Sequence, residues 1–233
     1  MVKISEPTRM DPTLPFINFH AHHQSNIDGV LTVVNIDLGK NESWSPLYQA
    51  CSVGIHPWSI DKNTIIQHFF QLEDACKNEN VVAVGEVGLD KLIDTPLTLQ
   101  SKVLEQQIEI ADFFNKPIII HCIGAYYELI AIKKKLKTNI SFVIHGFNKN
   151  AQVMKDLLDN GFYLSLGTAL NQTGSPLLQL VKDIPSTRLL LETDDKNSPI
   201  QGMYLVASEV LKIDIEELKL QIYDNYKRIL KIQ

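Results

Sequence analysis

The sequence predicts an α/β protein, a single (β/α)8 barrel in which the first crossovers are shortened. Two observations lead to this fold class. Short apolar runs, rich in β-branched residues and without polar alternation, recur along the 233 residues, as expected of strands that a parallel sheet buries on both faces. Helical stripes of apolar residues lie between most of these runs, and a chain of ~200–250 residues often forms such a barrel as one domain.

Eight apolar runs account for the eight expected strands. They are Phe16–Phe19, Val30–Ile36, Ala50–Ile55, Val81–Gly85, Pro117–Ile120, Phe142–Ile144, Gly161–Leu166 and Arg188–Leu191. Between the first two runs too few residues remain for a helical crossover, which takes ~10–12 residues, so we expect a loop there. A short link is also expected between the second and third runs.

The expected helices follow the third and later strands. One stripe begins after Asp61, and another follows Asp94-Thr95-Pro96, where a capping residue and a proline are typical of a helix start. The remaining stripes are Leu129–Leu136, Val153–Leu158 (closed by Gly161), Tyr204–Leu211 and Ile215–Leu230. Strands and helices therefore alternate over most of the chain.

Composition and charge narrow the class of protein. We expect an N-terminal extension over residues 1–15 and the barrel over residues 16–233. No run approaches the ~18 apolar residues of a transmembrane helix, and the N-terminus lacks the apolar core of a signal peptide. These features predict a cytoplasmic protein with no membrane contact and no obligate protein partner. The net charge of -5 argues against broad nucleic-acid binding but leaves a small acidic substrate open.

Histidines and carboxylates stand where the expected strands end. They are His20, His22, His56, Glu86, His121, His145 and Asp194. In a (β/α)8 barrel the C-terminal ends of the strands meet at one mouth, where active sites are built. Several imidazoles that converge on one mouth with two carboxylates are hard to explain as packing.

The spacing of His20 and His22 favours a metal. On a strand the side-chain period is two, so both imidazoles project from one face, and a bound cation would satisfy them. With the other strand-end residues except His56, the pair makes four imidazoles and two carboxylates. This set is too large for one tetrahedral zinc and suits two divalent ions, Mg²⁺, Mn²⁺ or Zn²⁺, with one carboxylate bridging. Two such ions hold a hydroxide at neutral pH, which predicts a hydrolase acting at phosphorus or at a polarised carbonyl.

Seven stretches of the chain resemble the TatD-related deoxyribonucleases, metal-dependent hydrolases of the amidohydrolase superfamily. They are NFHAHH, VGIHPW, AVGEVGLD, PIIIHC, VIHGFNKN, LLLETDD and a C-terminal NYKRIL. The resemblance implies a first metal held by His20, His22, Glu86 and Asp194, and a second held by His121, His145 and Glu86. It also implies that Asp194 acts as general base toward the attacking water and that His56 lies near the substrate. The implied activity is a DNase or 3′-to-5′ exonuclease on single-stranded ends, working through a metal-bound hydroxide.

The sequence departs from the family in the residues expected around the substrate. Asn18 stands where the family usually has Asp, and Ile123-Gly124 replaces a common Arg-Asp, which removes a cation that would face phosphate. Asn148 and Lys149, after His145, are candidate substrate contacts. The altered shell leaves alternatives open: hydrolysis of a small ester or amide (an aminoacyl ester, a lactone, a cyclic amide), or a non-catalytic metal-binding scaffold. The expected partner is a nucleic-acid end or a small phosphorylated or ester substrate.

Four further residues lie near the expected site without a firm place in it. Trp58 could stack a nucleobase or pack in a loop. Asp90 and Lys91 are expected to form a solvated loop pair. His23, on the opposite strand face from His22, is expected to lie outside the metal site.

Overall fold

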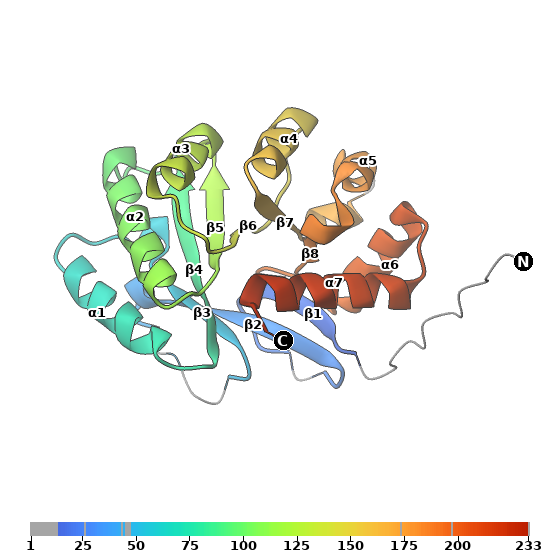
Figure 1. Ribbon diagram of the computed structural model, residues 1–233, viewed down its shortest axis with the longest axis horizontal. Helices are drawn as coiled ribbons and strands as arrows, with labels where there is room; N and C mark the ends of the chain where they lie inside the picture. Colours follow the sequence, from blue (N-terminus) through green and yellow to red (C-terminus); the bar gives the residue numbers. More distant parts are fainter. Residues whose placement is uncertain are drawn as a thin grey trace, which may run out of the picture.

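Eight parallel strands lie side by side in the order of the chain, with helices around them (Figure 1). The structure is a computed structural model that describes residues 14–25, 27–42, 44, 48–172, 174–196 and 198–232. The strands are β1 Phe16–Ala21, β2 Val30–Asp37, β3 Cys51–Gly54, β4 Val81–Asp90, β5 Ile118–Ile123, β6 Phe142–Ile144, β7 Phe162–Leu166 and β8 Leu189–Leu191. Each overlaps one of the apolar runs, and the predicted (β/α)8 barrel is confirmed.

The helices occur where the sequence predicts them, with one addition. They are α1 Ile65–Cys76, α2 Leu97–Phe113, α3 Tyr126–Leu136, α4 Ala151–Asp159, α5 Leu177–Leu180, α6 Gln201–Leu211 and α7 Ile215–Leu230. The short α5, between β7 and β8, has no counterpart in the sequence prediction. At the start of α2 Pro96 is the capping residue and no side chain caps the helix, so the expected cap at Asp94 or Thr95 is wrong. None of the helices in the described residues is long and apolar enough to span a membrane.

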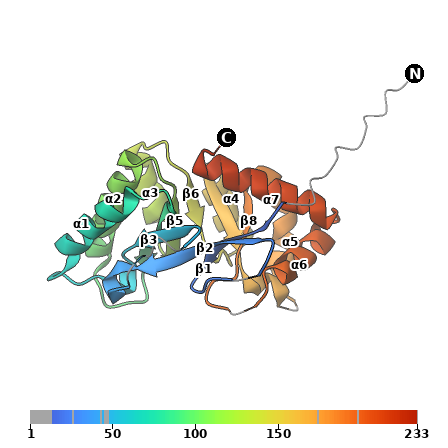
Figure 2. The ribbon, with the colours of Figure 1, turned by 90° about the horizontal axis from the view of Figure 1, so that it is seen from below.

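The first crossovers are short, as expected. Residues 22–25 and 27–29, between β1 and β2, form no helix, and the described residues between β2 and β3 form one 3₁₀ turn, Leu38–Lys40. In Figure 2 the blue strand β2 accordingly crosses the molecule with no described helix drawn over it. Residues 1–13 lie outside the described part of the chain, so the N-terminal extension stays a prediction.

The seam between β8 and β1 is closed mainly at the mouth. Ala21 and Asp194 form an isolated parallel bridge. Below it, the Asn18 amide donates to Thr193 Oγ1 at 2.8 Å, and the Thr193 backbone N–H donates to Asn18 Oδ1 at 3.0 Å. Farther down, the buried Tyr204 hydroxyl of α6 accepts from Ile17 N and donates to Ile17 O. Side chains thus complete the barrel where strand pairing between β8 and β1 is sparse.

Strand β4 is longer than the sequence predicts, and this changes the placement of its polar residues. It continues to Asp90, and its register against β5 shifts between Val84 and Val87 because β4 carries one extra residue there. Such bulges re-aim side chains and are common beside active sites. Glu86 therefore lies at a bulge inside the strand, not at its end.

Candidate active site

Glu86 lies at the centre of the mouth, between two pairs of histidines. One carboxylate oxygen, Oε1, is 2.7 Å from His145 Nε2 and 3.0 Å from His121 Nδ1. The other, Oε2, is 3.5 Å from His20 Nε2 and 3.7 Å from His22 Nε2. Only 4% of the Glu86 side chain is exposed. A single buried carboxylate thus presents a different oxygen to each pair.

Asp194 faces His20 and His22 from the junction of β8 and β1. Its Oδ1 is 3.6 Å from His20 Nε2 and 3.4 Å from His22 Nε2. The residue has φ +55°, a left-handed conformation that is uncommon outside glycine, and its backbone pairs with β1 on both sides, through His20 O and His22 N. Strained backbone of this kind concentrates at functional sites. The bridge to β1 holds the carboxylate beside the two imidazoles.

A buried carboxylate orients His121. Asp90 Oδ2 lies 3.2 Å from His121 Nε2 and also accepts the Trp58 indole N–H at 2.7 Å. A proton on Nε2, shared with Asp90, leaves the lone pair of Nδ1 directed at Glu86 and at any cation bound there. The expectation of a solvated Asp90–Lys91 loop pair is wrong, because Asp90 is buried at the end of β4. Lys91 pairs with Glu128 instead.

Glu192 stands in the same relation to His145, a role that the sequence analysis did not assign. Its Oε1 lies 3.4 Å from His145 Nδ1 and accepts the Gly146 backbone N–H at 2.7 Å. The side chain is fully buried at the end of β8. Glu192 thereby directs His145 Nε2 toward Glu86. The sequence feature that could have identified Glu192 is its position directly after an expected strand, two residues before Asp194.

His56 approaches Glu86 as a hydrogen-bond donor. Its Nδ1 accepts the Trp58 backbone N–H at 3.2 Å, so a neutral imidazole carries its proton on Nε2. This Nε2 lies 3.1 Å from Glu86 Oε1. The ring is buried beside His121, with centroids 4.6 Å apart. His56 therefore has no free lone pair facing the site in this tautomer, in contrast to the residues around it.

The donor set fits divalent cations. His20 is fully buried, yet neither ring nitrogen has a hydrogen-bond partner, and a cation on Nε2 would relieve part of that cost. Burial and the neighbouring His145 oppose protonation, but Asp194 and Glu86 raise the pKa of His20 to about 9. Burial likewise opposes ionisation of Glu86, while His145, His121 and His20 hold its pKa well below the ordinary value. A proton on the buried His20 thus supplies positive charge where a bound cation would supply it.

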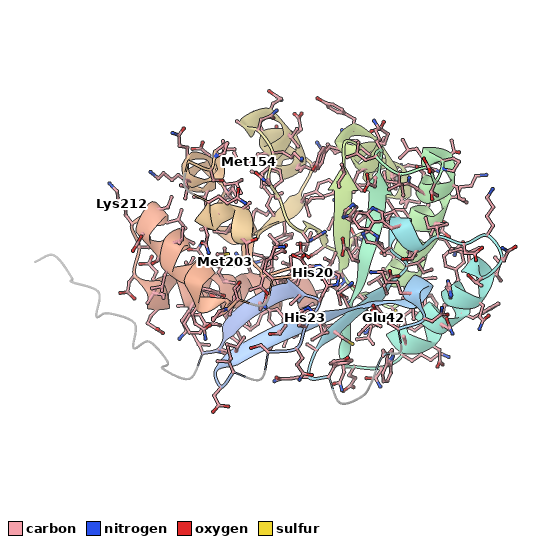
Figure 3. The ribbon with its side chains drawn as sticks, turned by 180° about the vertical axis from the view of Figure 1, so that it is seen from behind. His20, His23, Glu42, Met154, Met203 and Lys212 are labelled. Carbon is pink, nitrogen blue, oxygen red and sulfur yellow. The ribbon has the colours of Figure 1, made fainter. Side chains whose placement is uncertain are left out.

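One cavity of about 340 Å³ at the mouth of the barrel is lined by His22, His56, Glu86, His121, His145 and Asp194. Its wall also includes Asn35, Asp37, Lys40, Trp58 and Asp195. Lys40 is the sole lysine or arginine among the lining residues in the described part of the chain. Figure 3 labels His20 near the centre of the molecule in that view. The exposed His23 lies on a second, smaller cavity, away from the six predicted metal ligands, which we call the metal-ligand cluster.

Comparison with known proteins assigns the family. The profile described as "TatD related DNase" matches residues 31–231. The chain belongs to the TatD-related DNase family. It is 30% identical over 208 residues to the uncharacterized metal-dependent hydrolase YabD of Bacillus subtilis, covering 82% of this chain and 80% of YabD. It is also 30% identical to the uncharacterized metal-dependent hydrolase YjjV of Escherichia coli over 165 residues, 69% of this chain and 62% of YjjV.

Solved structures agree with the TatD-type barrel. The crystal structure of E. coli YjjV superposes with a TM-score of 0.77 at 22% identity and covers 95% of this chain and 100% of YjjV. A TatD family hydrolase from Entamoeba histolytica gives a TM-score of 0.75 at 17% identity, over 94% and 99% of the two chains. At this identity the likeness concerns the fold.

The six predicted metal ligands of this TatD-related chain come together, but two predicted substrate contacts lie elsewhere. Asn148 and Lys149 are exposed after β6 and are not among the residues that line the cavity. Their contact with substrate stays a prediction, since a longer substrate can extend past the cavity. Ile123 ends β5 and supplies no charge, as the sequence indicates. The cation that does line the cavity, Lys40, comes from the turn after β2.

Proposed function

We propose that the protein is a metal-dependent hydrolase that uses two divalent cations to cleave phosphodiester bonds at single-stranded DNA ends, from the 3′ end. The geometry of Glu86, whose two oxygens face different histidine pairs, carries this proposal. A carboxylate shared between two sets of ligands is typical of two-metal hydrolases. Membership in the TatD-related DNases supports a nuclease, and the names of the B. subtilis and E. coli relatives support metal-dependent hydrolysis.

The ligands divide into two sets that share Glu86. One cation would be held by His20, His22, Asp194 and Glu86, and the other by His121, His145 and Glu86. Mixed imidazole and carboxylate ligands suit Mg²⁺, Mn²⁺ and Zn²⁺. When bound, such cations polarise phosphate oxygens and lower the pKa of water.

Asp194 is the carboxylate that we assign as general base. Its side chain is 35% exposed, against 4% for Glu86, so water in the cavity reaches it. It is ionised over the whole physiological range, because His20 and His22 outweigh the effect of burial and hold its pKa well below the ordinary value. On the opposite side of Glu86, the His56 imidazole lines the cavity and donates its Nε2–H to Glu86 Oε1, so we place this ring beside the substrate.

The charge of the molecule favours a strand end as substrate. The net charge is -5, and the cavity wall includes Asp37, Asp195 and Asp194 against one lysine. Two divalent cations add four positive charges where a phosphate would bind, so the local sign opposes the net sign. An extended duplex would also meet the acidic surface, whereas a single-stranded end engages the mouth alone.

The decisive experiment is cleavage of end-labelled single-stranded DNA by the metal-loaded protein. We expect shortening from the 3′ end by the wild type, abolished by chelation and reduced at least ~100-fold in Asp194→Asn. Asp74→Asn changes an exposed aspartate of α1 and serves as the matched control, with wild-type rate expected. Equal rates for the wild type and Asp194→Asn would exclude nuclease activity at this site.

If the protein does not cleave DNA, two other results would each assign a different function. Turnover of aminoacyl esters, lactones or cyclic amides, lost in Asp194→Asn, would assign the same machinery to a small ester or amide; the missing arginine at Ile123 favours that outcome. Tight metal binding without turnover of any substrate would indicate a non-catalytic scaffold. Either result contradicts the proposed nuclease.

A further inference from the structure

Two short turns on one side of the mouth are tied together by a buried carboxylate. They are Leu38–Lys40, after β2, and Pro57–Ser59, after β3. Asp37 Oδ1 accepts the backbone N–H of Gly39 at 3.0 Å and that of His56 at 3.3 Å. Asp37 Oδ2 accepts the Ser59 hydroxyl at 2.5 Å. The two turns therefore form one unit that borders the cavity.

Gly39 allows the turns to touch. A Cβ on Gly39 would lie 2.4 Å from Ser59 Cβ and 2.6 Å from the Ser59 carbonyl oxygen, closer than atoms can approach. Any larger residue there would push the first turn away from the second. The contact between Gly39 and Ser59 fixes the spacing between their chain neighbours, Lys40 and Trp58.

Trp58 is held in place although most of its side chain is open to solvent. It is 61% exposed, and its indole N–H donates to the buried Asp90 at 2.7 Å. Its ring stands at 89° to that of His56, with centroids 5.0 Å apart, and at 77° to that of His121, with centroids 5.7 Å apart. A large exposed aromatic fixed by its edge is a platform for a flat ligand, because base–aromatic stacking needs only an open face.

Lys40 adds a positive charge beside this platform. Its side chain is 54% exposed, and its Nζ lies 3.8 Å from Oδ2 of the buried Asp37, a long contact that leaves the ammonium open to an anion. The side chain lines the same cavity as Trp58 and the metal-ligand cluster. The open face of Trp58 suits a base, and the ammonium of Lys40 suits a phosphate of the same strand.

We propose that Trp58 and Lys40 form a nucleotide subsite, in which the indole stacks on a base next to the scissile phosphate and the ammonium binds a neighbouring phosphate. This inference rests on the proposed nuclease function, because it assigns the substrate contacts of the same cavity. It explains how a chain with Ile123 in place of a cation can still hold a strand: the charge comes from the turn after β2.

Binding tests the subsite without turnover. Trp44→Phe leaves Trp58 as the one tryptophan of the chain. In this background, with metal-loaded protein, we expect deoxyadenosine and dAMP to quench Trp58 fluorescence and deoxyribose 5-phosphate to leave it unchanged. Lys40→Met should weaken dAMP several-fold and leave deoxyadenosine unaffected. Lys155→Met, on the outer face of α4, is the matched control. If neither deoxyadenosine nor dAMP quenches the fluorescence of Trp58, the proposed subsite is wrong.

Cleavage provides the second test. With 3′-labelled oligonucleotides that carry an abasic residue at one of the last three positions, the wild type should lose about 5- to 140-fold in kcat/KM at one position, the effect of one stacked base. Trp58→Ala should cleave intact and abasic ends at equal rates. Phe113→Ala, at an exposed aromatic of α2, should keep the preference of the wild type.

The two tests separate the subsite from the function on which it rests. DNA cleavage with the same abasic preference in Trp58→Ala would refute the subsite and leave the nuclease standing. Quenching by nucleotides without any DNA cleavage would refute the nuclease, and the subsite would stand as a nucleotide-binding site. Gly39→Ala should raise KM more than it lowers kcat, since it separates the two turns and leaves the metal ligands in place.

Discussion

The carboxylate of Asp90 lies 3.2 Å from Nε2 of His121, and both side chains are largely buried at the mouth. The same carboxylate holds the Trp58 indole, and its remaining oxygen accepts the Leu92 backbone N–H at 2.8 Å. Asp90 thus connects the wall of the cavity to a predicted metal ligand. Although burial opposes ionisation, the Trp58 N–H, the Leu92 N–H and His121 lower the pKa of Asp90, so it remains charged.

Asp90→Asn should weaken metal binding. The neutral amide cannot stabilise the Nε2 proton as a carboxylate does, so His121 loses both orientation and basicity. Loss of such a partner typically costs 10–100-fold in metal affinity. Titration with Mn²⁺ or Zn²⁺ against a competing chelator measures the effect, with Asp74→Asn as the exposed control. Unchanged affinity in Asp90→Asn would show that His121 is not a ligand.

Glu86→Gln should reduce the metal content from two ions per chain to one. Without the shared carboxylate, the first set keeps three ligands, whereas the second keeps only His121 and His145. The second ion should therefore leave first. Elemental analysis after desalting measures the stoichiometry, and Glu73→Gln, at an exposed position of α1, should retain both ions. One ion in the wild type, or two in Glu86→Gln, would contradict the bridging role.

The strands and the convergence of the predicted ligands could be inferred from the sequence because each depends on a local pattern. Buried parallel strands have uninterrupted apolar runs, such as Val81–Val84 and Ile118–Ile120, and a barrel brings their C-terminal ends to one mouth. His20 and His22 follow from the two-residue period of β1. For these residues, sequence position alone nearly determines spatial position.

Residues whose roles depend on long-range contacts were not predictable. Asp90 looks like part of a polar loop because Gly85, Glu86 and Gly88 interrupt the apolar run, yet β4 continues through a bulge and buries it. The role of Glu192 depends on where His145 lies, 47 positions earlier in the numbering. Lys40 lines the cavity from a turn whose Gly39 packs against Ser59, far from it in sequence. None of these contacts leaves a periodic signal.

The stability of the metal-free protein should be greatest at mildly acidic pH. The pKa of His20 rises from 6.5 to about 9 on folding, so its contribution is complete below pH 6.5 and is lost as the pH rises through about 9. The pKa of Glu86 is lowered from 4.5, so its contribution is present above that value and is lost in acid. The thermal midpoint after chelation should peak between these limits and fall by several degrees toward pH 9.

Metal should move this optimum upward, because bound cations need deprotonated imidazoles. Differential scanning fluorimetry across pH 4 to 10, with chelator or with Mn²⁺, measures both profiles. His20→Gln should flatten the alkaline decline, and the exposed His23→Gln should keep it. A chelated wild-type midpoint that stays constant between pH 6 and 9 would contradict the assigned interactions of His20.

Gly88→Ala should displace His121 by forcing β4 and β5 apart. Gly88 pairs with His121 across β4 and β5, and a Cβ there would lie 1.8 Å from the His121 carbonyl oxygen. Since the backbone of β4 fixes the Cβ and the oxygen belongs to the backbone of β5, the strands must separate where Asp90 meets His121. Gly29→Ala is the matched control: it also has positive φ, but nothing lies within 4 Å of its Cβ, so it should cost only ~1–2 kcal/mol. Denaturant unfolding should show a clearly larger loss for Gly88→Ala, together with weaker metal binding that Gly29→Ala does not share. Equal losses in the two variants would mean that the close approach of β4 to His121 does not hold that imidazole in place.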